Sequence, residues 1–148
     1  MTLGSFSATQ TSRIINTTVA LSPCMSIDLV LAFKSKPTDL KVRVEERGFV
    51  LRQMVPDEPE KAITFTYRYF AQGLSRRGVW FTYNDTFDRD DEEHWSMLAP
   101  GVKFVATASV STDDGRNGFD EMVQYSVAQS FRNRYESLLF DMYDGELS

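Results

Sequence analysis

The sequence predicts one α+β domain, in which a twisted, mainly antiparallel sheet of about five to six strands carries a short N-terminal helix and a long C-terminal helix on one face. Three observations lead to this prediction. The chain has 148 residues, of which 42% are hydrophobic and 25% charged, the composition of a globular protein with a sizeable core. Short segments in its middle alternate apolar and polar residues, as strands do. Near the C-terminus, apolar residues recur instead at steps of three and four, as on a helix.

The N-terminal part is predicted to hold an arm, a strand and the short helix. Residues 1–12 are rich in serine and threonine and predict an arm, which leaves residues 13–148 as the single domain. Residues 13–21 contain many β-branched side chains, typical of a strand. The following Ser-Pro pair resembles a helix start. Residues 24–36 are apolar on more than one face, so a buried helix and a core strand both fit, and our element order uses the helix.

A hairpin is predicted next. Residues 41–46 alternate, which places Val42 and Val44 on one face of a strand. The Arg-Gly pair at 47–48 is typical of a turn, and residues 49–55 return as the second strand.

The most clearly predicted strands are aromatic. Residues 62–71 alternate rings with threonine and arginine, and residues 79–83 repeat the pattern after a loop. If the two strands pair antiparallel, their rings become cross-strand neighbours, which contribute about 0.2–1 kcal/mol per pair. These rings form the core or line a ligand pocket, together with a tyrosine of the C-terminal helix. The candidate pocket residues are Phe65, Tyr67, Tyr69, Phe81, Tyr83 and Tyr125.

The last third is predicted to be an acidic connection, a strand and the long helix. Residues 84–101 form the connection, with one helical turn, and residues 102–111 form the strand. The helix runs from Phe119 to Met142 and ends at Gly145. The pattern of residues 119–128 also fits a strand, and the helix is preferred because its apolar steps continue.

The charge is divided between the two halves of the chain. Residues 1–84 carry 11 basic and 7 acidic residues, a net +4, whereas residues 85–148 carry 5 and 14, a net −9. Such a division fits a self-assembling subunit with complementary faces, and it equally fits charges scattered over a soluble surface. The overall charge of −5 opposes general nucleic-acid binding, since a phosphate backbone would be repelled. No apolar run is long enough to span a membrane, and no secretory signal precedes residue 13, so we expect a cytoplasmic protein or one assembled within a particle.

The densest group of acids predicts a surface for a basic partner. An alternative is a cation site, but the spacing does not match a calcium-binding loop and His94 is the only histidine, so we expect neither a metal nor a cofactor. His94 itself is expected in an exposed loop. The candidate partner-binding residues are Asp85, Asp88, Asp90, Asp91, Glu92 and Glu93.

Three functions remain open. The first is a non-catalytic assembly or interaction subunit, such as a viral or phage structural component or an acidic inhibitor of the immunity type, that uses the arm and the acidic loop. The second is a small-molecule-binding domain with the aromatic pocket, because the order of elements resembles the helix-grip arrangement of START-like domains. The third is a small enzyme built on that pocket, although no nucleophile, phosphate-binding or dinucleotide-binding motif occurs.

Overall fold

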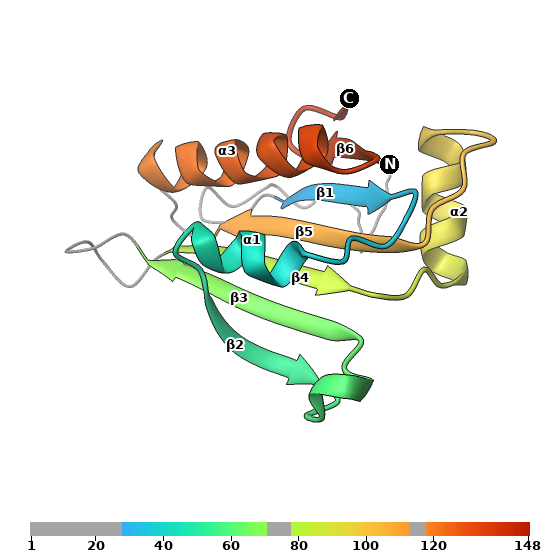
Figure 1. Ribbon diagram of the computed structural model, residues 1–148. Helices are drawn as coiled ribbons and strands as arrows, with labels where there is room; N and C mark the ends of the chain where they lie inside the picture. The colour runs from blue at the N-terminus through green and yellow to red at the C-terminus, as the bar shows by residue number, and fades with distance from the viewer. Residues whose placement is uncertain (1–27, 71–77, 113–117) are drawn as a thin grey trace, which may run out of the picture.

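The protein is an α+β domain built on one twisted antiparallel sheet, as predicted, and the sheet is larger than predicted (Figure 1). The computed structural model describes residues 28–70, 78–112 and 118–148, and the predicted arm and first strand lie outside these ranges. Seven strands of the described residues pair in the order β2-β3-β4-β5-β1-β6-β7, every pair antiparallel. The strands are β1 (Asp28–Phe33), β2 (Val50–Val55), β3 (Thr64–Phe70), β4 (Gly78–Asn84), β5 (Ala106–Thr112), β6 (Ser137–Asp141) and β7 (Glu146–Leu147). The helices are α1 (Leu40–Glu46), α2 (Arg89–Leu98), α3 (Gly118–Arg134) and the short 3-10 helix η1 (Pro59–Lys61).

The two faces of the sheet bury two separate apolar clusters. The larger one joins α1 and α3 to the face that carries Phe33 and Phe81, with Phe131 of α3 packed on it. The smaller one joins α2 to the opposite face, where Trp95 packs on Ala32. Figure 1 shows α3 along the strands and α2 crossing the end of the sheet. Helices therefore cover both faces, rather than the single face that the sequence predicted.

The prediction of a short N-terminal helix within residues 24–36 is wrong, because residues 28–33 form strand β1, the alternative that the sequence left open. This strand lies between β5 and β6. Leu29, Leu31 and Phe33 face α1 and α3, whereas Val30 and Ala32 face the α2 side. A strand buried on both faces is apolar at nearly every position, and periodicity cannot separate it from a buried helix.

The predicted strand at 41–46 is also wrong, because these residues belong to helix α1. Leu40 and Val44, one helical turn apart, are 5% and 1% exposed, whereas Val42 is 55% exposed. Gly48 ends the helix with a φ of +91°, which favours glycine, and its N–H donates to the carbonyl of Glu45 at 3.0 Å. The segment 50–55 is a strand as predicted, but it pairs with β3 and forms no hairpin with its predecessor.

The aromatic strands form as predicted. β3 and β4 pair antiparallel with Phe65 opposite Tyr83 and Tyr67 opposite Phe81, so the rings are cross-strand neighbours on one face. This face is the one beneath α1 and α3.

The acidic connection holds a ten-residue helix, α2, where one turn was expected. Asp88 caps it: its carboxylate accepts from the N–H of Asp91 at 2.9 Å, and the Asp91 carboxylate accepts from the N–H of Asp88 at 3.2 Å. This capping box satisfies two N–H groups that the first turn leaves unpaired. The strand that follows begins at Ala106, four residues later than predicted.

Residues 119–128 are helical, as preferred, but the C-terminal helix is shorter than predicted. It ends at Arg134, and the Ser137 hydroxyl donates to the carbonyl of Tyr135 at 3.1 Å. The chain then returns to the sheet as β6, where Leu139 faces α3 and Leu138 faces α2. Gly145 lies in the turn to β7, with a φ of +75°, rather than at a helix end. The sequence predicts both leucines on the helix because their spacing from Phe131 and Tyr135 fits a period of 3.6, and the structure places them on a strand.

Candidate functional site

An aromatic recess opens between α1, the loop before it, and the sheet. Its volume is about 200 Å³. Four of the six rings predicted to line a pocket face it, and the loop, α1 and the residue after β4 complete its wall. The lining residues are Pro37, Thr38, Leu40, Lys41, Phe65, Tyr67, Phe81, Tyr83 and Asp85.

The floor of the recess is fixed by ring packing. Phe65 stacks on Tyr83 with ring centroids 6.5 Å apart and an interplanar angle of 22°. Phe81 meets Phe131 of α3 edge to face at 5.5 Å, which closes the inner end against the core. The inner rings are therefore core, as one reading of the sequence held, while the outer rings leave a recess beneath α1.

Each tyrosine of the recess donates its hydroxyl to a carboxylate. The Tyr83 hydroxyl donates to Asp85 Oδ1 at 2.7 Å, and the Tyr67 hydroxyl donates to Glu45 Oε2 at 3.3 Å. Burial, aided by these acids, raises the pKa of both phenols well above the usual range. Both tyrosines therefore stay neutral at physiological pH, and their oxygens keep lone pairs that can accept from a ligand.

Two lysines complete the charge pattern at the rim. The Lys41 ammonium lies 4.7 Å from the centre of the Phe65 ring, a cation–π contact. The Lys36 ammonium lies 3.4 Å from Asp85 Oδ2. The rim thus offers an acidic and a basic group above an aromatic floor.

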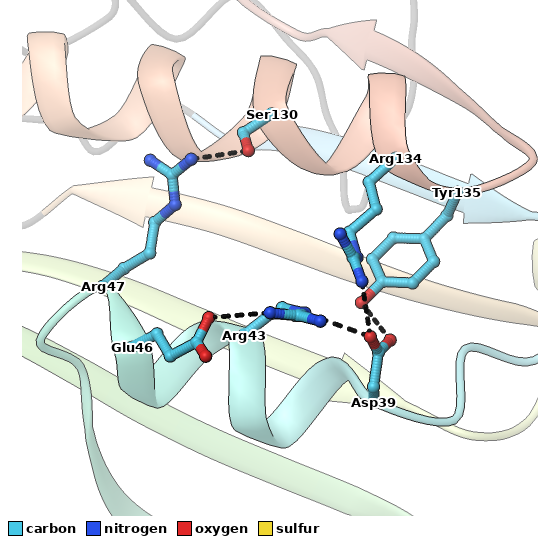
Figure 2. Close-up of polar contacts among 7 residues, drawn as sticks. All are labelled: Asp39, Arg43, Glu46, Arg47, Ser130, Arg134 and Tyr135. Carbon is cyan, nitrogen blue, oxygen red and sulfur yellow. Dashed lines mark hydrogen bonds and ion pairs between the residues drawn. The ribbon is translucent and has the colours of Figure 1, made fainter.

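Helix α1 is held in place by Asp39 (Figure 2). The Asp39 carboxylate accepts from the Tyr135 hydroxyl at 2.7 Å, from Arg134 at 2.8 Å and from Arg43 at 3.1 Å. The hydrogen bonds from Tyr135 and Arg134 hold the pKa of Asp39 well below its usual range. These bonds join the start of α1 to the end of α3, and so they set the wall of the recess.

The other two predicted pocket residues lie elsewhere. Tyr69 lines a second recess, of about 270 Å³, with Arg47 and the start of α3. The Tyr125 hydroxyl donates to Asp141 Oδ2 at 2.6 Å and is not among the residues that line the aromatic recess.

The six acids predicted as a partner surface separate into three groups. Asp85 belongs to the aromatic recess. Asp88 and Asp91 form the capping box of α2, and burial raises the pKa of Asp91 to about 6. The remaining three are Asp90, Glu92 and Glu93, which are exposed on α2.

The sequence did not reveal the α1 side of the recess. The sequence predicts a strand that begins at Lys41, and it gives neither Thr38 nor Lys41 a place in the candidate pocket. A signal was present, because Asp39, Arg43 and Glu46 have the i, i+4 and i, i+3 spacing of helical ion pairs, and these pairs form.

The described residues hold no group of three or more histidine, cysteine or acidic side chains placed to bind a metal ion. His94, expected in an exposed loop, lies half-buried on α2 with its ring 6.0 Å from that of Phe140, and burial lowers its pKa.

None of the described helices combines the length and apolar character needed to cross a membrane. Comparison with protein-family models, curated proteins and solved structures finds no match to this chain.

Proposed function

We propose that this domain binds a small molecule of about one ring in the aromatic recess beneath α1. One observation carries the proposal: four predicted rings converge on a recess of about 200 Å³ with an acid and a base at its rim. Pockets that combine an apolar lining with a few polar groups are the usual ligand sites of small domains.

The volume limits the ligand. Sites for drug-sized ligands occupy about 300–1,000 Å³, whereas a cavity of about 150 Å³ takes up benzene. A ligand with one ring and a short substituent fits between these limits.

The polar groups define the substituent. Both phenols already donate to carboxylates, and the ammonium groups of Lys41 and Lys36 lie against the Phe65 ring and Asp85, so the free sites for a ligand are the acceptor oxygens of Tyr83 and Asp85. An amine or another N–H donor beside the ring satisfies them. Benzylamine has this chemistry, and benzyl alcohol and benzoate are its neutral and anionic counterparts.

The test is a titration of the full chain with each of these three probes, monitored by two-dimensional amide NMR. We expect the order benzylamine, benzyl alcohol, benzoate, with the largest shifts at Phe65, Tyr67 and Tyr83. Replacing Thr38 on the rim by tryptophan should weaken benzylamine binding about tenfold or more, close to 1.4 kcal/mol. Thr86→Trp, at an exposed position outside the recess, is the control. The absence of shifts at these residues with every probe at about 10 mM, enough to detect millimolar binding, would refute the proposal.

A second candidate function is a protein-interaction subunit, and one feature of α2 favours it. Asp90, Glu92 and Glu93 are exposed on this helix, and Met97 beside them is 74% exposed. Charge around an exposed apolar side chain is the common make-up of a transient interface.

This candidate predicts that complexes isolated at low salt dissociate at high salt. Native mass spectrometry of the purified protein detects a homo-oligomer or a co-purifying chain. The triple change Asp90→Asn, Glu92→Gln, Glu93→Gln should abolish the complex. Neutralising the three acids of segment 56–61 is the control of equal charge. A complex that survives the α2 triple change rejects this surface, and deletion of residues 2–12 separately tests the predicted arm.

A further inference from the structure

Three arginines converge on a cleft between α1 and α3, on the other side of α1 from the aromatic recess. Arg43 lies on α1, Arg47 at its C-terminal cap and Arg134 at the end of α3. Figure 2 shows Arg47 and Arg134 at opposite ends of the cleft with Arg43 between them. The cleft has a volume of about 320 Å³ and is also lined by Ser130 and Phe131.

Two of these arginines are compensated by carboxylates. Asp39 accepts from Arg43 and Arg134, and Glu46 accepts from Arg43 at 3.0 Å. Asp39 therefore fixes the orientation of both guanidinium groups before any ligand arrives. Such pre-orientation lowers the entropy cost of binding.

Arg47 is different, because its partners are hydroxyls. It donates to Ser130 Oγ at 2.6 Å and to Ser126 Oγ at 3.4 Å. Among the described residues, no carboxylate lies within ion-pair distance of Arg47. Together with Asp39 and Glu46, the three arginines leave the cleft with one net positive charge in a protein whose net charge is −5.

We propose that this cleft binds a phosphate-type oxyanion, either inorganic phosphate or a small phosphate monoester, between Arg47 and Arg134. The planar fork of a guanidinium matches two oxygens of such an anion, and these charge-assisted bonds are the strongest hydrogen bonds available. The Ser130 hydroxyl, which accepts from Arg47 in the free protein, can turn its proton to the anion while it keeps this bond. Phe131 beneath them keeps one side of the cleft apolar, which strengthens the electrostatic attraction.

The site is independent of the proposed ligand in the aromatic recess. The two sites lie on opposite sides of α1 and share no lining residue. Loss of one therefore leaves the other testable.

The experiment titrates the full chain with inorganic phosphate and, separately, with glycerol 3-phosphate, at constant ionic strength maintained with sodium chloride. Amide NMR follows residues 43–47 and 126–134. We expect saturable shifts in both segments. Arg47→Gln should weaken binding about tenfold or more, as expected for loss of a charge-assisted hydrogen bond, and Ser130→Ala less. Arg52→Gln, which removes the same charge from an exposed position on edge strand β2, should leave it unchanged.

Tighter binding of the monoester identifies an ester as the ligand class, and tighter binding of phosphate identifies the free anion. Either result supports the site. Binding that is equal in the Arg47→Gln variant and the wild type overturns the proposal, as do shifts that chloride alone reproduces.

Discussion

The environments of Val42 and Val44 provide the sharpest test of the fold around the candidate site. In a strand the two side chains share a face, whereas in α1 they do not: Val44 is 1% exposed and Val42 is 55% exposed. Val44→Ala removes two buried methyl groups at about 0.8 kcal/mol each and leaves a small cavity, while the better helix propensity of alanine returns roughly 0.5 kcal/mol. We expect a net loss of about 2 kcal/mol. Val42→Ala loses no buried group and gains the same propensity, so its effect should stay within about 0.5 kcal/mol.

The assay is equilibrium urea unfolding of both variants and the wild type, followed by tryptophan fluorescence. Where the dependence of the free energy of unfolding on urea concentration is the same in all three proteins, a change in the midpoint reports a change in stability. Equal losses in the two variants would show that the valines share a buried face. The helix, the Asp39 contacts that position it and the recess beneath it would then all be wrong.

Three further perturbations test other parts of the structure. Gly78→Ala places a methyl group against the backbone carbonyl of Tyr69 and should cost about 2–3 kcal/mol in urea unfolding, whereas Gly118→Ala, in open space, should cost nothing. Burial raises the pKa of Asp28 to about 6, so the folded state holds this proton more tightly than the unfolded state does. The contribution of Asp28 to stability should therefore fall as pH rises from about 4 to about 6, by at most about 3 kcal/mol. The difference in stability between the wild type and Asp28→Asn should show this dependence, because the raised pKa of Asp91 acts equally in both proteins. Asp88→Ala removes the cap of α2 and should cost about 1 kcal/mol, and a thermal shift comparison with Glu92→Ala separates capping from surface charge.

The two aromatic strands were predicted correctly, whereas the similar but shorter alternation over residues 41–46 belongs to helix α1. In β3, Phe65 and Tyr67 alternate with threonines, and this period of two cannot be read as a helix. The same alternation placed four rings on one face and so predicted the floor of the recess. The prediction of element type also failed where the apolar residues fit both the period of a strand and the period of a helix, as at Leu138 and Leu139.

The candidate partner surface shows a different limit. Its six acids were grouped because they are neighbours in sequence, and sequence distance does not report the direction of a side chain. Asp85 accepts from a tyrosine hydroxyl and Asp88 from the backbone N–H of Asp91, and only the three-dimensional structure separates them from the exposed acids of α2.

The sequence by itself determined the α+β fold class and the aromatic face of the sheet. Composition and local alternation are sufficient for this, because a sheet buries the same side of each strand whatever its neighbours are. The tertiary structure decided that residues 40–46 are helical, that β1 lies inside the sheet, and that arginines of α1 and α3 face one cleft. These features depend on contacts between residues distant in sequence, above all the burial of Leu40 and Val44 in the main apolar cluster, and the energy of that burial exceeds the small local preferences of a short segment.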